Sequence, residues 1–117
     1  MPVKRALSFT IMYSLKDIKE RSESEDELVV GYSDAIKLLD IFEQNNTQAH
    51  GWEGWLKSED GKLSHSQKYQ GTSDLSALPN TSAISLIKST IMRAHAEWQE
   101  KPEVSNACLL FCITINT

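Results

Sequence analysis

The stretch Ala107-Cys108-Leu109-Leu110-Phe111-Cys112-Ile113-Thr114-Ile115 decides the fold of this 117-residue sequence. Successive residues of a strand point to opposite faces, and here the side chains of both faces are apolar. A strand of this kind is covered on both sides, so it lies centrally in its sheet. We expect helices to cover one face, and either the long loops or a second copy of the chain to cover the other. The run is about half as long as a membrane-spanning helix, so no membrane association is expected.

Two helices are predicted upstream of this strand. Apolar residues recur at helical spacing from Ser33, whose hydroxyl suits an N-cap, as far as residues 45–46, two asparagines that favour caps and turns. A second run begins at Asn80 or Thr81 and ends before Pro102, because the residue ahead of a proline is disfavoured in a helix. Each helix carries an apolar stripe, so both are expected to pack on the sheet.

Three further segments are predicted to be extended. Residues 7–15 alternate apolar and polar side chains, which predicts a strand with one buried face. Residues 28–30 suit a short strand that pairs back on this first strand across a long loop. Residues 52–72 predict a hairpin that turns at Gly61. Neither face of its second strand is strongly apolar, so the hairpin is expected near an edge of the sheet.

The element order is strand, loop or short strand, helix, hairpin, helix and strand. It predicts a single α+β domain over residues 1–117, with one small sheet of about 4–5 mostly antiparallel strands and two helices packed on one face. A ferredoxin-like βαββαβ arrangement is one candidate. Over about residues 33–115, the order of helix, Gly/Trp hairpin, helix and apolar last strand loosely resembles that of the immunity proteins that neutralise tRNA-cleaving colicins. This resemblance transfers no residue roles.

The net charge is −4, from 12 basic and 16 acidic residues. Without a basic surplus, generic nucleic-acid binding is not expected. The acidic surplus is local, because residues 16–27 hold six acids and three bases, which gives −3 of the −4. We interpret this stretch as a mobile loop or a fraying helical turn. Its charge either is solvated or attracts a basic partner, and the stretch tolerates deletion if it has no partner. No signal-peptide cleavage pattern follows the first apolar residues, so a cytoplasmic location is expected.

No cofactor, metal site or catalytic residue is predicted. Cys108 and Cys112 would lie on one face of the last strand about 13 Å apart, too far for a disulfide within that strand. The three histidines have neither the mutual spacing nor the cysteine partners of a metal site. Ser66 follows His65 directly and points to the opposite face of the predicted strand, so His65 cannot activate it as a nucleophile.

The predicted hairpin and the loop after it hold the candidate binding residues. Two tryptophans three positions apart point to opposite faces of a regular strand, so one would enter the core and the other would lie on the outer surface, where it suits a binding anchor. The alternative is that both lie in the core or under a loop. The return strand aligns a histidine, an amide and a phenol in one row, and a hydroxyl-rich loop with one carboxylate follows it. The six candidates are Trp52, Trp55, His65, Gln67, Tyr69 and Asp74.

These features favour a small cytoplasmic, non-catalytic protein-interaction domain, such as an inhibitor, an immunity-like protein or an accessory subunit. The two-sided apolar strand also favours self-association. The alternative hypothesis is a small-ligand-binding protein or an enzyme with a polar pocket around the 52–72 hairpin. Convergence of Trp55, His65, Gln67 and Tyr69 on one concavity would favour this alternative.

Overall fold

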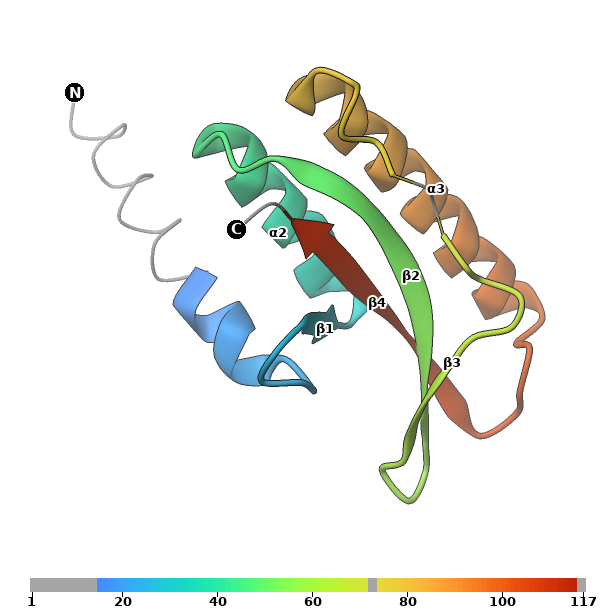
Figure 1. Cartoon of the computed structure of the whole chain (residues 1–117). Coiled ribbons are helices and arrows are strands. Elements are labelled where there is room, and N and C mark those ends of the chain that lie inside the picture. The colour runs from blue at the N-terminus through green and yellow to red at the C-terminus, as the bar shows by residue number, and fades with distance from the viewer. Residues whose placement is uncertain (1–14, 72–73, 116–117) are drawn as a thin grey trace.

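The computed structural model describes residues 15–71 and 74–115. They form an α+β fold with one antiparallel sheet of four strands, as the sequence predicts (Figure 1). The first described element is a helical segment over residues 15–21. The elements that follow it are β1 (Leu28–Val30), α2 (Tyr32–Gln44), β2 (Ala49–Ser58), β3 (Leu63–His65), α3 (Asn80–Glu100) and β4 (Ala107–Ile115).

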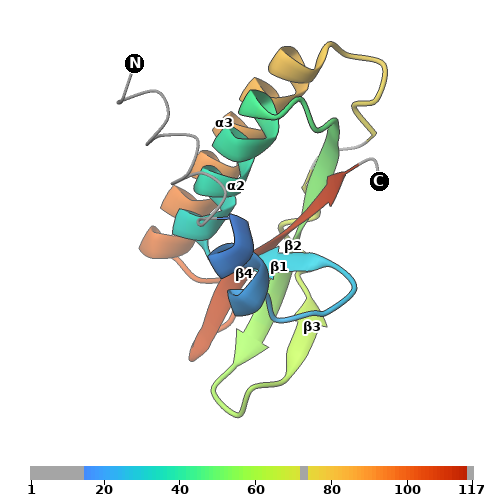
Figure 2. The same cartoon turned by 90° about the vertical axis from the view of Figure 1, so that its left-hand side faces the viewer.

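The strands lie in the order β1-β4-β2-β3, so the prediction of a central last strand is confirmed. Both β1 and β2 are antiparallel to β4, and they therefore run parallel to each other with β4 between them. A ferredoxin-like arrangement would put β1 between β4 and the hairpin, so the chain does not adopt that candidate. Helices α2 and α3 lie side by side on one face of the sheet, as both views show (Figure 1, Figure 2).

The main core lies between these two helices and the sheet. Phe111 of β4 is fully buried there among the apolar stripes of both helices. Trp52 of β2 also lies in this core, whereas Trp55 lies half-buried on the opposite face of the sheet, which confirms the predicted division of the two tryptophans. Core packing occupies the helix-covered face, which leaves the opposite face and the rims of the sheet for other contacts.

The segment ahead of β1 differs from the prediction. Residues 15–21 are helical, so the prediction of a strand is wrong at Leu15, and the other residues of that predicted strand, 7–14, lie outside the described residues. Ile18 is 0% exposed and packs in the main core. A single apolar residue in a charged run produces no periodicity, so the sequence suggests a fraying helical turn as one alternative but not a helix packed in the core. The mobility proposed for residues 16–27 stays a prediction.

The start of α2 also differs from the prediction, while its end at Asn45 is confirmed. Gly31 is the N-cap, with no side-chain hydrogen bond, and Ser33 lies inside the first turn. The neighbouring Asp34 accepts hydrogen bonds from the Arg21 guanidinium at 2.8 and 2.9 Å, so an ion pair joins this first turn to the helical segment 15–21. Within the described residues, no helix is both long and apolar enough to span a lipid bilayer.

The hairpin forms as predicted, but β3 ends at His65 rather than at residue 72. The Ser66 hydroxyl donates to a Glu103 carboxylate oxygen at 2.7 Å and accepts the backbone N–H of Tyr69 at 2.8 Å. The chain therefore leaves the regular strand, and the predicted alternation of faces fails. Tyr69 turns onto the helix side, where it is 6% exposed. The partner that redirects the chain is distant in sequence, so local pattern could not show it.

Two glycines allow the segment 66–71 to lie directly against β2. The Gly54 N–H donates to the Tyr69 carbonyl at 2.7 Å, and the Ser66 N–H donates to the Gly54 carbonyl at 2.9 Å. Gly71 has a φ of +80°, and a Cβ there would meet a backbone oxygen of β2 at 1.7 Å. Residues without a side chain are required at both close approaches.

Candidate functional site

The candidate site is the face of the sheet opposite α2 and α3, which we call the open face. The register of the strands places Glu53 and Trp55 of β2 beside Cys112 and Leu110 of β4. His65 of β3 lies beside Trp55. Figure 2 shows α2 and α3 on one side of the sheet and the turn ahead of β1 on the other. The open face is therefore shaped by strand side chains and by that turn.

The turn at residues 22–27 covers part of the open face. The Ser22 hydroxyl organises it by donating to the Glu27 carbonyl at 2.8 Å and accepting the Val29 N–H at 3.0 Å. Glu23 forms an ion pair with Lys57 of β2, which fastens the turn across the sheet. On this face Leu110 and Cys112 of β4 are buried beside Val29 and Trp55, with Leu110 9% exposed. Cys108 of the same face is exposed, so the turn covers β4 at Cys112 but not over its whole length.

A compact group of two carboxylates and one thiol lies under this turn. Suitable ligand atoms of Glu27, Glu53 and Cys112 lie within 4.8 Å of one another, and these types of side chain bind metal ions in other proteins. The Cys112 thiol donates to a Glu27 oxygen at 3.0 Å. Burial, the hydrogen bond to Glu27 and the nearby carboxylates raise the pKa of Cys112 well above its usual range. The thiol is therefore protonated at neutral pH and acts as a hydrogen-bond donor rather than as a nucleophile.

Two of the predicted binding residues meet on the open face where β2 pairs with the edge strand β3. The rings of Trp55 and His65 lie 4.6 Å apart at an angle of 50°. The Trp55 indole N–H donates to one oxygen of Glu53 at 3.2 Å, and the other oxygen lies 3.8 Å from Nδ1 of His65. Glu53 thus connects the aromatic pair to the carboxylate and thiol group.

The other four predicted residues do not join this site. Trp52 points into the core and donates its indole N–H to Thr90 of α3 at 2.8 Å. Tyr69 is buried on the helix side next to Trp98. Gln67 is exposed and is held through its backbone N–H.

Asp74 lies farther along the chain, with its carboxylate 4.0 Å from Nδ1 of His50. The backbone N–H of Ser76 holds the pKa of the Asp74 carboxyl below its usual range. This hydrogen bond is the local turn contact expected of an aspartate in a loop. Asp74 therefore contributes a charge to the rim of the sheet, away from Trp55 and His65.

Two neighbouring cavities hollow the open face and its rim. One of about 420 Å³ is lined by Asp26, Glu27, Glu53 and Thr114, together with apolar side chains. The other, of about 380 Å³, lies beside His50 and Asp74 and shares Glu53 and Thr114 with the first. We call the two together the carboxylate trough, after Asp26, Glu27, Glu53 and Asp74.

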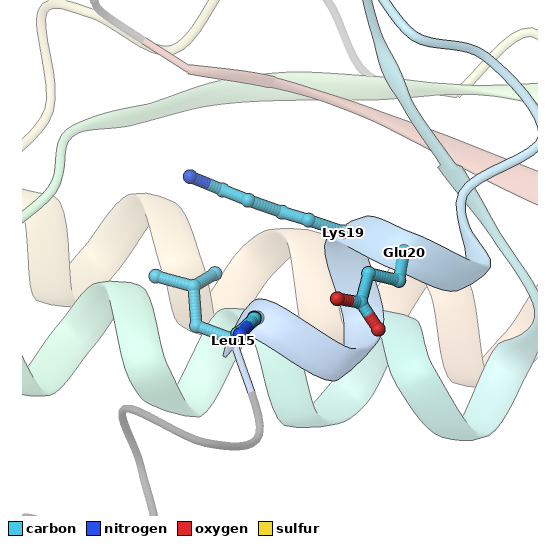
Figure 3. Close-up of a pocket in the computed structure, with 4 residues that line it drawn as sticks. Leu15, Lys19 and Glu20 are labelled. Carbon is cyan, nitrogen blue, oxygen red and sulfur yellow. The ribbon is translucent and has the colours of Figure 1, made fainter.

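Two further cavities lie away from the open face. One of about 440 Å³ borders the helical segment 15–21, where Leu15, Lys19 and Glu20 line it (Figure 3). The other, of about 400 Å³, runs along α3 and is lined by Tyr69, Arg93 and other residues of α3 and the 66–71 segment. The Tyr69 hydroxyl is buried and has no hydrogen-bond partner among the described residues.

Sequence reasoning missed Glu53, Glu27 and the placement of Cys112 between them. No family model, curated protein or solved structure matches this chain. The arrangement on the open face is therefore the basis for the functional argument.

Proposed function

We propose that this protein is a small non-catalytic interaction domain that holds a protein partner against its open face. Trp55 carries this proposal, because it lies half-buried in a sheet face with polar neighbours and no covering by α2 or α3. A large aromatic side chain with a polar rim is typical of a binding anchor. An inhibitor, an immunity-like protein or an accessory subunit in the cytoplasm would each use such a surface.

The chemistry of the open face supports binding over catalysis. The Cys112 thiol is held protonated by burial and by Glu27, so it lacks the character of a nucleophile. His65 is exposed, and on the open face it contacts Glu53 and Trp55. A general base must reach a nucleophile or a proton-bearing group of a substrate. Neither contact of His65 is with a nucleophile, so the two contacts position its ring rather than activate a group for catalysis.

Self-association is a narrower form of the same proposal. The apolar second face of β4 favours it in the sequence, but Val29 and Trp55 already pack on that face within one chain. Light scattering during size-exclusion chromatography, across a range of protein concentrations, tests this form. A dimer that Trp55→Ala dissociates would make a second copy the partner, and a monomer at every concentration would exclude it.

The main test compares two surface variants of the full chain. Trp55→Ala removes the anchor, and Leu86→Ser changes an exposed apolar residue of α3 as the matched control. We expect proteins from the source cell to be retained by the wild type and by Leu86→Ser but lost from Trp55→Ala. In the reconstituted complex, hydrogen exchange should slow in β3 and the 22–27 turn. Retention that is equal for both variants, or protection confined to α3, would contradict the proposal.

One observation favours the alternative of small-ligand binding. The cavity along α3 lies beside Tyr69, whose buried hydroxyl lacks a hydrogen-bond partner among the described residues. Buried polar groups are normally satisfied, so a ligand or a water molecule is a natural partner. Thermal shifts against a metabolite panel test this function, with Tyr69→Phe as the variant that should lose the shift. A shift that Tyr69→Phe retains would place the ligand elsewhere.

A further inference from the structure

The cavity along α3 has a cationic lining although the chain as a whole is acidic. Lys68 and Arg93 line it together with a single carboxylate, that of Glu97, so positive charge exceeds negative charge in the described lining. Arg21 and Lys88 each form an ion pair with a carboxylate. In the described residues, neither Lys68 nor Arg93 has a carboxylate within ion-pair distance. The cavity therefore offers two cations that are not held by an ion pair within the described part of the chain.

A buried hydroxyl without a partner belongs to the same cavity. Tyr69 lines the cavity and is 6% exposed, and its hydroxyl has no hydrogen-bond partner among the described residues. Buried hydroxyls are normally hydrogen-bonded, so this one is available to a bound molecule. The Lys68 ammonium lies 5.3 Å from the centre of the Tyr69 ring. An anion that accepts a hydrogen bond from the hydroxyl would therefore lie close to this cation.

The remaining lining suits an apolar body attached to such an anion. Trp52 and Ala94 line the cavity, and both pack in the main core on the helix side of the sheet. The volume of about 400 Å³ lies within the range of small-molecule sites. Because the Tyr69 hydroxyl is buried, a ligand must displace part of the cavity wall to reach it. The exposed side chains of Lys68 and Arg93 are the parts of this wall that move most readily.

We infer that the cavity along α3 binds a small organic anion, whose carboxylate or phosphate group pairs with Arg93 and Lys68 and accepts a hydrogen bond from the Tyr69 hydroxyl. This inference rests on the ligand-binding alternative proposed above and names the class of ligand. Hydrogen bonds from a guanidinium or an ammonium to an oxyanion are roughly twice as strong as neutral ones. The cavity lies on the helix side, whereas Trp55 lies on the open face, so both sites can act in one chain.

The experiment titrates the isotope-labelled full chain with single-ring compounds that differ in their polar group. Benzoate and phenyl phosphate are anions, benzamide is neutral and benzylamine is a cation. The reporter is the proton–nitrogen NMR signal of the Trp52 indole, which lines the cavity and donates to Thr90. We expect an anion to shift this signal, and the tighter of the two anions identifies the charged group. Benzamide and benzylamine should bind at least about fivefold more weakly.

Two variants test the residues that would hold the anion. Arg93→Gln should weaken anion binding at least about fivefold, while Lys37→Gln, which removes a charge from an exposed position of α2, should stay within about twofold. Tyr69→Phe should also weaken anion binding. It should not lower the urea midpoint of the free chain, because the hydroxyl that it removes has no partner to lose among the described residues. A lowered midpoint would mean that the hydroxyl is bonded within the folded chain, which contradicts the inference.

Three other results would overturn the inference. They are benzamide binding as tightly as the anions, equal weakening by Arg93→Gln and Lys37→Gln, and no shift of the Trp52 signal with either anion. If neither anion binds, but a compound of the metabolite panel gives a thermal shift that Tyr69→Phe abolishes, the ligand-binding function stands without the anionic class. The partner function is tested separately through Trp55→Ala on the open face.

Discussion

Replacing Gly54 with alanine should disrupt the packing of the 66–71 segment on β2. A Cβ at this position would lie 2.5 Å from the Tyr69 carbonyl oxygen and 2.9 Å from the Tyr69 Cβ. Both contacts are shorter than the separation that real Cβ atoms tolerate, and one of them is with backbone, which cannot rotate away. The 66–71 segment would have to move, and the hydrogen bonds that Gly54 makes with Tyr69 and Ser66 would lengthen.

The expected loss of stability follows from these contacts. Each backbone hydrogen bond contributes about 1 kcal/mol net, so weakening both costs up to about 2 kcal/mol. Overpacking a well-filled site adds at least about 1 kcal/mol. We therefore expect Gly54→Ala to lower the free energy of unfolding by about 3 kcal/mol, a large share of the ~5–15 kcal/mol available to a typical domain.

Urea unfolding, followed by circular dichroism and tryptophan fluorescence, measures this loss. Gly31→Ala is the matched control, because Gly31 has a φ of −72° and a Cβ there meets nothing within 4 Å. The weaker N-cap preference of alanine and its lower unfolded-state entropy should offset each other to within about 0.5 kcal/mol. If Gly54→Ala proves as stable as Gly31→Ala, the 66–71 segment is not pressed against β2 and the argument fails.

Three further substitutions test other parts of the fold by the same unfolding assay. Ile18→Ala should cost about 2–5 kcal/mol because the side chain is fully buried, and a loss below about 1 kcal/mol would contradict its place in the core. Ser66→Ala should cost about 1–3 kcal/mol because the buried Tyr69 N–H and the Glu103 carboxylate lose their partner. The Arg21 guanidinium holds the pKa of the Asp34 carboxyl below its usual range. The ion pair therefore stabilises the folded chain above the pKa that Asp34 has when unfolded, and this stabilisation is lost as pH falls through the pKa that Asp34 has when folded. Asp34→Asn should therefore be less stable than the wild type at neutral pH and equally stable in strong acid, and a difference that persists in acid would refute this cause.

The elements with strong periodicity could be predicted from the sequence. The bounds of β4 and the ends of α2 and α3 follow from apolar spacing and from Asn45 and Pro102. The turn before β3 follows from Gly61, which has a φ of +87°. Local sequence does not determine strand order, because antiparallel pairing of β1 with β4 depends on how the whole core closes. The packing of the helical segment 15–21 in the core was missed for a different reason, since one buried residue leaves no periodic signal.

The candidate site was only partly predictable. Trp55 and His65 could be singled out because a tryptophan and a histidine in a weakly apolar hairpin are unusual, and the register of β2 with β3 brings them together. Glu27 and Glu53 could not, because each looks like an ordinary charged residue in sequence. They meet because Glu53 lies opposite Cys112 in the register of β2 with β4, while Glu27 reaches the same thiol from the turn just ahead of β1. These acids become a candidate site through the pairing of distant segments rather than through any motif.

The turn at residues 22–27 is fastened to the sheet, whereas the sequence suggested either a solvated loop or a docking site for a basic partner. As a solvated loop it would tolerate deletion, yet Ser22 holds the turn on β1 and the ion pair of Glu23 with Lys57 holds it on β2. Deletion would expose Cys112, which donates to Glu27 and is 3% exposed in the folded chain. Burial of apolar surface stabilises by about 25 cal/mol per Å², so this loss acts on the fold whether or not a partner binds. The same turn presents Asp26 and Glu27 to the trough. The contacts of Ser22 and Glu23 therefore hold the turn in place, and only substitutions that keep the backbone and remove the charges of Asp26 and Glu27 test whether those charges have a role of their own.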